Sequence, residues 1–464
     1  MKLVDFDNPV RASWLADQGF RLDPGPFISE TYAARMMLKS LPKTEGLGDL
    51  TERIFRPGIF KRQRTEFKQH GVPFLSSVDI LEADISNLPM ITKKSFGRVS
   101  DLALEPGWTL ITRSGMNLGR VAYSRPEMDG FACSEHVLRA IPAKTIPGGY
   151  LYIFLASRYG TAMIKGGIYG SSIKHIEPPH LLDIPVPRLG NEIESHIDSL
   201  VQEAMTLRSK YQAGVVSATE DLFNSSGIPE LLEYSWHSEP PDTGFVVTGL
   251  SANSLRALNY SPRAAQLIKR IRAVEHRSLG DICRGGLLGS GKQFKRVDSD
   301  REHGVCLISQ RQGSWMRPEG RWINPTMAPA GIIVPDETVL LTAQGGGDSF
   351  CRPLLVAGRW RDFAYTQHFL RIRSGDPAIS GPYLFAFLRS EVAFRMMQSV
   401  SAGSMQQDIH YFLRQQLPVP LCDNESRARI TETVRQAYRC RDEADVLEDE
   451  AMMLLENAIR EAAR

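Results

Sequence analysis

The sequence repeats itself at a nearly constant offset of 232 residues. Residues 131–139, FACSEHVLR, return as residues 363–371, FAYTQHFLR. Weaker pairs at offsets of 232 or 233 are 47–50 with 279–282, 71–76 with 304–309, 150–155 with 383–388, 170–171 with 403–404, and 184–187 with 417–420. Periods of 20–50 residues indicate solenoids or propellers. This much longer period predicts two copies of a whole domain.

Composition sets the class of protein. A chain of 464 residues predicts two to four domains. Hydrophobic residues at 42% and charged residues at 23% are ordinary for a folded protein, and no stretch approaches the ~20 apolar residues of a membrane span. The first residues have no apolar signal-peptide core, and the six cysteines form no Cys-x-x-Cys pair. These features predict a cytoplasmic protein without a zinc site or disulfide framework.

Each copy shows the same order of expected elements. A helical segment (30–40, then 262–274) precedes a strand-rich middle with Gly-rich turns. An apolar helix follows (149–165, then 382–399), and a Pro-x-Pro sequence closes the copy. The pattern predicts an α/β (α+β) fold with two similar globular domains.

A long polar helix follows each Pro-x-Pro, at about 192–224 and 425–463. Its apolar positions alternate spacings of four and three, which is typical of a coiled coil. The expected interface residues are Ile193, Ile197, Leu200, Ala204, Leu207, Tyr211, Leu222, Ile430, Ala437, Ala444, Leu447 and Ala451. We expect the two helices to pair antiparallel. The predicted boundaries are 1–190 (first domain), 191–224 (helix), 225–255 (linker), 256–422 (second domain) and 423–464 (helix).

Three catalytic hypotheses have some support in the sequence. Residues 286–292, GLLGSGK, have the spacing of a phosphate-binding P-loop. However, Gln293 replaces the Ser or Thr that binds Mg²⁺, and the equivalent residues 54–60 of the first copy contain no lysine. Asp49 with Glu66 and Lys68 loosely resembles a nuclease site, but the second copy lacks the glutamate. No Asn/Asp-Pro-Pro-aromatic tetrad of an amino-methyltransferase occurs.

The repeated histidines are the third hypothesis. His136 and His368 fall in alternating segments that predict half-buried strands, and neither has an adjacent nucleophile or metal ligand. We therefore predict that they are structural core residues. The chain is predicted to bind a partner and to have no catalytic residues or metal site of its own.

The order of these motifs resembles the specificity (S) subunits of Type I restriction-modification systems. The resemblance covers about residues 20–464. It rests on the Leu-Gly-Asp start, the 71–76 strand, the loop from Thr112 to Arg120, the Gly-Ser turn, the 184–187 sequence and the long helix, most of which occur twice. The second copy departs from this pattern, since residues 344–349 replace the Gly-x-x-x-Gly-Arg loop, and the role of residues 1–41 is not part of it.

The resemblance implies two target recognition domains with pseudo-twofold symmetry, separated by the antiparallel helices. Each domain would read half of a bipartite site in double-stranded DNA. Two methyltransferase (M) subunits, which use S-adenosylmethionine, would dock on the helices, and motor-nuclease (R) subunits could join. This chain itself would hold no cofactor.

DNA contacts are expected from the basic segments and the Gly-rich loops. Arg and Lys suit guanine and phosphate, and Asn and Gln suit adenine. The candidates are Lys61, Arg62, Arg64, Lys68, Arg113, Asn117, Ser171, Lys174, Lys292, Lys295, Arg296, Gln310, Arg311, Gln344, Ser404, Gln406 and Gln407. The alternatives are an S-like subunit of another methyltransferase-based phage-defence system, a P-loop nucleotide hydrolase, and a scaffold that binds a dimeric protein.

Overall fold

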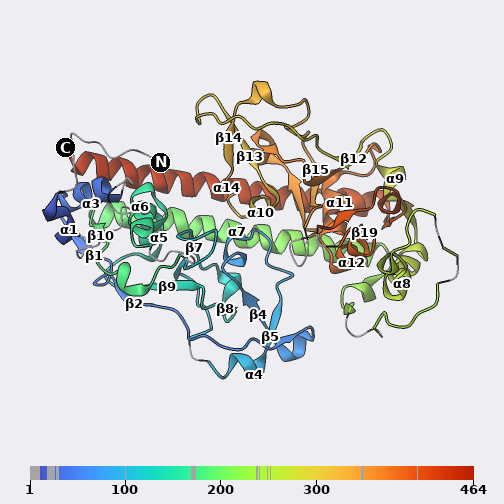
Figure 1. Ribbon diagram of the computed structural model, residues 1–464, viewed down its shortest axis with the longest axis horizontal. Helices are drawn as coiled ribbons and strands as arrows, with labels where there is room; N and C mark the ends of the chain where they lie inside the picture. The colour runs from blue at the N-terminus through green and yellow to red at the C-terminus, as the bar shows by residue number, and fades with distance from the viewer. Residues whose placement is uncertain are drawn as a thin grey trace. The chain divides into compact units, whose positions relative to one another are not determined.

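The computed structural model comprises two compact units (Figure 1). It describes residues 11–17, 27, 31–99, 101–168, 174–236, 239, 241–247, 249–250, 252–345, 350–404 and 406–464. Unit 1 is made of residues up to 81, 88–209 and 443–464. Unit 2 is made of residues 82–87 and 210–442, so each unit takes part of both long helices.

Unit 1 is built around an antiparallel sheet in the order β2-β9-β6-β7. Its strands are β2 (Thr51–Phe55), β6 (Thr109–Thr112), β7 (Val121–Tyr123) and β9 (Val137–Pro142). A second sheet, β3-β5-β4-β8, contains β3 (Arg64–Thr65), β4 (Gly71–Leu75), β5 (Met90–Thr92) and β8 (Ala132–Cys133). A short pair joins β1 (Thr44–Gly46) to β10 (Pro185–Pro187).

Unit 2 repeats this topology. Its main sheet has the order β12-β18-β15-β16, from β12 (Leu287–Ser290), β15 (Thr338–Thr342), β16 (Pro353–Val356) and β18 (Phe369–Arg373). The second sheet is β14-β13-β17, from β13 (Val305–Ile308), β14 (Arg321–Ile323) and β17 (Ala364–Tyr365). The pair β11 (His276–Ser278) and β21 (Pro418–Pro420) matches β1 and β10.

The repeat extends to strand register and to buried hydrogen bonds. Leu110 faces Arg139 in unit 1, and Leu340 faces Arg371 in unit 2. β4 and β8 pair in parallel, as do β13 and β17. The hydroxyl of Tyr150 donates to the carbonyl of Pro187 over 2.6 Å, and Tyr383 donates to Pro420 over 2.9 Å. The predicted α+β fold with two similar domains is confirmed.

The repeated Leu-Gly-Asp sequence has a packing reason. A Cβ atom at Gly280 would lie 2.9 Å from the Cβ of Gln415, and one at Gly48 would lie 3.2 Å from a side-chain carbon of Leu182. Leu182 and Gln415 are themselves equivalent at an offset of 233. Glycine thus allows the same close approach in both units.

The single apolar helix predicted in each copy is wrong, because each is two helices. Unit 1 has α5 (Gly148–Ala156) and α6 (Arg158–Gly166), and unit 2 has α11 (Gly381–Leu388) and α12 (Glu391–Ser399). Ser157 separates the first pair, and Arg389 and Ser390 separate the second. The hydroxyl of Ser157 accepts from the backbone N–H of Gly160 over 3.2 Å, and that of Ser390 accepts from Ala393 over 3.1 Å. A side chain that caps a new helix favours a break at that residue.

The shorter helices at the start of each copy are α3 (Thr31–Lys39) and α8 (Pro262–Arg272), close to the predicted bounds. The segment 225–255 follows α7. Its residues Ile228 and Leu231 are buried, and Tyr234 and Trp236 pack against the core of unit 2. The start of this segment is therefore packed on unit 2.

The two predicted long helices are α7 (Asn191–Ser225) and α14 (Asn424–Ala462). α14 starts after Asp423, whose carboxylate accepts from the backbone N–H of Ser426 over 2.9 Å and caps the helix. Among the described residues, no helix is long and apolar enough to cross a membrane.

Within unit 2 the two helices run antiparallel. The rings of Tyr211 and Tyr438 lie 5.4 Å apart, and Asp221 pairs with Arg429 at 2.8 Å. A residue further along α7 thus contacts a residue nearer the start of α14. A Cβ atom at Gly214 would lie 2.8 Å from the Cβ of Ala437. The backbones therefore approach closely at this level.

Most of the expected interface residues are buried: Ile197, Leu200, Ala204, Leu207, Tyr211, Leu222, Ile430, Ala437, Ala444 and Ala451. Ile193 differs, because its side chain is 37% exposed in the first turn of α7, and Leu447 is only partly buried. On α14 the other half of the 4-3 repeat is Val434, Arg441, Glu448 and Leu455, all buried. Two of these four, Arg441 and Glu448, are charged, so a pattern of apolar residues could not identify them as interface positions.

Candidate nucleic-acid interface

The same polar cluster occurs in both units, at the turn that enters β9 or β18. His136 lies between β8 and β9, and His368 lies between β17 and β18. The loop after β6 approaches the first histidine, since the backbone N–H of Arg113 donates to the carbonyl of His136 over 2.8 Å. The loop after β15 does the same, since Ala343 donates to His368 over 3.2 Å.

A third segment completes each cluster. Ser114 forms a β-bridge with His175 in unit 1, and Gly345 forms one with Gln407 in unit 2. His175 and Gln407 are 232 residues apart. Three separate segments therefore converge at each repeated histidine. The bond from the loop to the histidine carbonyl is equivalent in the two units, whereas the third segment bonds through Ile176 and Arg113 in unit 1 and through Gln407 and Gly345 in unit 2. Figure 1 labels β8 and β9, which flank the turn of His136, and β15, which precedes the loop that approaches His368.

The loops that follow β6 and β15 close in the same way although their sequences differ. In unit 1 the backbone N–H of Arg120 donates to the hydroxyl of Thr112 over 2.9 Å. In unit 2 the N–H of Arg352 donates to the hydroxyl of Thr342 over 2.7 Å. The departure of residues 344–349 from the family pattern thus leaves the base of the loop unchanged.

In unit 1 the cluster is charged. Nδ1 of His136 lies 2.8 Å from the hydroxyl of Ser114, and its Nε2 lies 3.6 Å from Oε1 of Glu135. Arg62 donates to the same carboxylate oxygen over 2.7 Å. Burial alone would raise the pKa of Glu135, but the Arg62 hydrogen bond and charge outweigh it and the pKa is lowered. Burial also lowers the pKa of His136, helped by the nearby Arg62 and Arg113.

Arg113, expected to contact DNA, is held by a carboxylate. Its Nη2 donates to Glu177, which also accepts from Nε of Arg56 over 3.1 Å. The Arg113 side chain is only 11% exposed. The guanidinium therefore joins the loop after β6 to the segment that carries Glu177, rather than extending from the surface.

In unit 2 the same positions are neutral amides. Gln367 replaces Glu135, and its Nε2 lies 3.1 Å from Nε2 of His368. Nδ1 of His368 hydrogen-bonds with Oε1 of Gln344. Arg296 donates from Nη2 to Oε1 of Gln367 over 3.4 Å, in the place that Arg62 takes in unit 1. Burial, followed by the charge of Arg296, lowers the pKa of His368.

Gln310 is expected to read DNA, but its amide is engaged by the loop after β15. Its Oε1 accepts from the backbone N–H of Ala343 over 2.7 Å and of Gln344 over 3.0 Å. Its Nε2 donates to the carbonyl of Gln344 over 3.0 Å. With these three bonds Gln310 positions Gln344.

The other candidate residues lie mostly on the surface. Arg64, on β3, is exposed, and Asn117 is partly buried. Ser171 lies outside the described residues. The remaining exposed candidates are Lys61, Lys68, Lys174, Lys292, Lys295, Arg311, Ser404 and Gln406.

The prediction that both histidines are core residues in strands is wrong. Each lies in a turn, and the side chain of His136 is 42% exposed. The alternating pattern of 131–139 misled because the chain turns between β8 and β9. Sequence reasoning also missed Glu135, Gln367 and Ser114. The sequence did contain a signal for Glu135 and Gln367. The residue before each repeated histidine differs between the two copies, whereas many of the residues around it match.

Two exposed aromatic residues were also missed. Tyr411 and Phe412 are 57% and 54% exposed, and their rings meet edge to face at 5.1 Å. They begin the short helix α13 (Tyr411–Gln415), which follows the segment of Gln407. Aromatic residues beside a polar cluster are suited to apolar contact with bases or their methyl groups.

The structure contradicts the P-loop hypothesis. Residues 287–290 form strand β12, paired with β18, and the next regular element after Lys292 is strand β13 rather than a helix. A Cβ atom at Gly286 would lie 2.2 Å from the carbonyl oxygen of Arg373, so this glycine permits close strand packing. In the described ranges, no group of three or more His, Cys, Asp or Glu residues could hold a metal ion.

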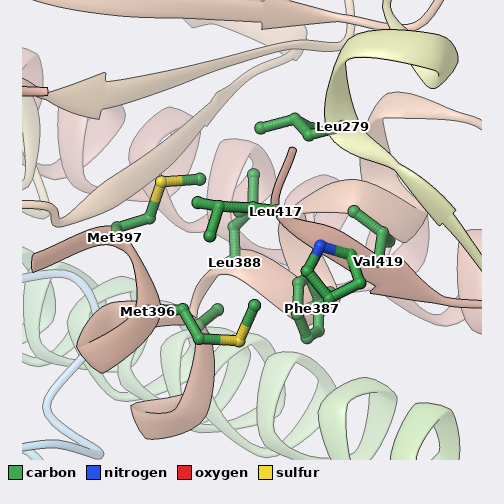
Figure 2. Close-up of a pocket in the computed structure, with 9 residues that line it drawn as sticks. Leu279, Phe387, Leu388, Met396, Met397, Leu417 and Val419 are labelled. Carbon is green, nitrogen blue, oxygen red and sulfur yellow. The ribbon is translucent and has the colours of Figure 1, made fainter. Parts of the chain in front are cut away.

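A small pocket in unit 2 offers no chemistry either. It is lined by apolar side chains that include Leu279, Phe387, Met396, Met397 and Leu417 (Figure 2). Side chains of α11 and α12 form most of its wall, with the leucine of the Leu-Gly-Asp sequence opposite. It therefore belongs to the core of unit 2.

No family model matches the sequence, and no curated protein sequence matches it. Among solved structures, the chain is similar to the Type I restriction-modification S subunit from M. genitalium, at 10% identity and a TM-score of 0.32 over 90% of this chain and 95% of that chain. It is also similar to the HsdS subunit from Thermoanaerobacter tengcongensis, at 13% identity and a TM-score of 0.27 over 91% and 97%.

A third similar structure is described as the structural basis of complex assembly and conformational transition of the type I R-M system. It matches at 13% identity and a TM-score of 0.27 over 91% of this chain and 98% of that chain. TM-scores this low do not establish a shared fold. The structural neighbours of this chain, matched along most of its length, are S subunits of Type I restriction-modification systems.

Proposed function

We propose that the chain is the DNA sequence-recognition subunit of a Type I restriction-modification complex. Unit 1 reads one part of a bipartite target and unit 2 reads the other. The observation that carries this proposal is the pair of equivalent polar clusters around His136 and His368. They are formed by the same three segments of each unit, and their side chains differ.

This combination favours sequence reading over a purely structural role. A cluster that only stabilised the fold would have no reason to exchange Glu135 for Gln367, or His175 for Gln407, where the same three segments meet. A reader of two different half-sites needs a constant framework with variable side chains, because base edges are distinguished by the donors and acceptors that meet them.

Exposed lysines flank each cluster and suit the phosphate backbone. Lys61 adjoins Arg62 of the first cluster, and Lys295 adjoins Arg296 of the second, and both lysines are exposed. Phosphate contacts give most of the affinity and make it depend on salt. A net charge of only +2 is compatible with this role if methyltransferase subunits supply further contacts.

The two long helices are proposed to dock the methyltransferase subunits and to set the spacing between half-sites. The S-adenosylmethionine site would then lie in those partners, and motor-nuclease subunits would join the complex for cleavage. The family resemblance supports this part of the proposal. Copurification with an adenine methyltransferase from the same genome, and loss of that association when α14 is truncated, would test it.

Filter binding to random-sequence duplexes over a salt series tests DNA binding itself, with a methyltransferase subunit present. We expect log affinity to fall linearly with log salt concentration. Lys61→Ala or Lys295→Ala should each weaken binding to all sequences alike and reduce the slope by about 1. Lys144→Ala, at an exposed lysine after β9, is the matched control and should change neither. Binding without salt dependence would contradict the proposal.

A further inference from the structure

The histidine at the centre of each cluster contacts polar neighbours whose donor and acceptor roles are fixed, and the direction of these contacts differs between the two units. The direction follows from which groups can only donate and which can only accept. An arginine guanidinium only donates, an ionised carboxylate only accepts, and an amide has one end of each kind.

In unit 2 the chain of bonds starts at Arg296. Because its guanidinium only donates, the oxygen of the Gln367 amide faces it, at 3.4 Å, and the amide nitrogen faces the ring of His368, at 3.1 Å. That nitrogen donates, so Nε2 of the ring must accept and the ring proton must be on Nδ1. Nδ1–H then donates to Oε1 of Gln344.

The result is an oriented amide on the surface of unit 2. The oxygen of Gln344 is engaged by His368, and its backbone is held by Gln310. Within the part of the chain that the structure describes, no group binds Nε2 of this exposed side chain. Gln344 therefore offers an NH₂ donor outward.

In unit 1 the direction is reversed. Glu135 is an acceptor that already receives Arg62, and its charge favours a proton on the facing Nε2 of His136, at 3.6 Å. Nδ1 is then bare and accepts the hydroxyl proton of Ser114 over 2.8 Å. Because the hydroxyl proton of Ser114 is donated to His136, the hydroxyl oxygen has only lone pairs left, and Ser114 acts as a hydrogen-bond acceptor toward the outside.

Both rings must be neutral for these directions to hold. Glu135 favours protonation of His136, while burial and the charges of Arg62, Arg113 and His175 oppose it, and the pKa is lowered. Asp408 favours protonation of His368, while burial and Arg296 oppose it, and that pKa is also lowered. Neutral rings are thus the stable state near neutral pH.

We propose that the two clusters read DNA with opposite hydrogen-bond polarity, set by the residue that precedes each histidine. Ser114 accepts from the amino group of adenine or cytosine, and Gln344 donates to the carbonyl oxygen of guanine or thymine. Glu135 and Gln367 are the positioning residues that impose the two directions. This inference rests on the proposed function and names the base classes that each unit selects.

The exchange of the two positioning residues tests the inference. With Gln367→Glu, the carboxylate draws the His368 proton to Nε2, the Gln344 amide turns to donate to Nδ1, and its oxygen faces outward. With Glu135→Gln, the His136 proton moves to Nδ1, and the Ser114 hydroxyl becomes a donor. The measurement is selection of duplexes from a randomised pool by the methyltransferase-bound complex.

We expect Gln367→Glu to change one position of its half-site from guanine or thymine to adenine or cytosine, by roughly fivefold or more. Glu135→Gln should cause the opposite change in the other half-site. Gln344→Glu, which removes the donor directly, should act on the same position as Gln367→Glu. The matched control is Gln416→Glu, at an exposed glutamine of unit 2 that is neither a candidate DNA contact nor part of the hydrogen-bond chain.

A second readout does not depend on DNA. Nitrogen chemical shifts of labelled histidine in the full chain report the tautomers, and we expect the proton on Nε2 in His136 and on Nδ1 in His368. The same tautomer in both, or unchanged base preferences in variants that still bind with normal salt dependence, would overturn the inference alone. Absence of salt-dependent binding by the unaltered complex would instead overturn the proposed function.

Discussion

Arg208 of α7 donates a hydrogen bond of 2.6 Å to Glu448 of α14, and the side chain of each residue is 2% exposed. The same nitrogen donates to Asp445 over 3.0 Å. Arg208 lies in the 4-3 repeat with Ala204 and Tyr211, so this ion pair is inside the seam of unit 1. A buried polar contact in such a seam fixes which residues can face one another.

Removal of one partner from this buried pair should be costly. Glu448→Ala removes the shorter of the two carboxylate contacts of Arg208 and leaves Asp445 as its remaining partner, so we expect a loss of about 2 kcal/mol in the stability of unit 1. Glu450→Ala, on the same helix and in the same unit, is the matched control, because this side chain is exposed and its removal should cost less than about 1 kcal/mol. Hydrogen exchange of the α7 amides in unit 1 measures both. Equal effects of the two substitutions would show that the seam tolerates the loss of the Arg208–Glu448 ion pair.

Asp84 should make unit 2 sensitive to acid. Its carboxylate accepts from Arg389 over 2.8 Å and is also bonded by Gln212 and Ser86. Burial alone would raise the pKa of Asp84, but Arg389 and these hydrogen bonds outweigh it and the pKa is lowered. Because the folded pKa lies below the unfolded one of about 3.9, the stabilisation is present above about pH 4 and is lost as the pH falls further.

Asp84→Asn should therefore destabilise unit 2 by about 2 kcal/mol at neutral pH and have a smaller effect in acid. Chemical unfolding at pH 7 and pH 3 compares the two conditions. Asp298→Asn is the control, since the Asp298–Arg321 pair is more than half exposed and its loss should change little. A destabilisation by Asp84→Asn that does not shrink at low pH would contradict this account.

The close approach of the helices at Gly214 gives a steric test. Gly214→Val places side-chain carbons against Ala437, where a Cβ atom alone would lie 2.8 Å from its neighbour. Overpacking of this kind costs about 1–3 kcal/mol. Ala213→Val, at the adjacent exposed residue, introduces the same side chain without the contact and should cost less than about 1 kcal/mol. Thermal unfolding measures the effect, and we expect a lower melting temperature for Gly214→Val than for Ala213→Val. Similar melting temperatures would contradict the close approach of the two helices at Gly214.

The repeat allowed much of the fold to be predicted, because equivalent residues keep equivalent backbone roles. It failed where equivalent side chains have different partners. Arg208 and Arg441 are 233 residues apart and both are buried. The counterparts of Asp445 and Glu448 on α7 are Gln212 and Val215, so Arg441 has no carboxylates there.

Arg441 instead pairs with the carboxylate of its neighbour Asp442, lies over the ring of Trp360 at 3.9 Å, and donates to the carbonyl of Ala357. No local sequence pattern predicts the contact with Trp360, because tertiary packing brings this residue to α14 from the short 3-10 helix at Gly358–Asp362. The candidate site shows the same limit. The basic segments were found from charge alone, whereas the histidine clusters depend on three segments that only the folded sheets bring together.

The proposed role of the long helices can be tested by shortening both. Removal of one heptad from 192–224 and the matching heptad from 425–463 shortens each helix by about 10 Å, or about three base pairs of DNA. We expect the spacing between half-sites to decrease while the half-site sequences stay the same. Selection of duplexes with variable spacers measures this, and an unchanged spacing would remove the helices as the ruler.

The most direct test of the central claim is selection from random duplexes by the chain in complex with its methyltransferase. The account predicts a target in two separated parts, with different sequences, and substitution of Gln344 should alter only one part while substitution of Ser114 alters only the other. A single continuous target, or equal enrichment of all sequences, would contradict the claim that the two units are separate readers of DNA.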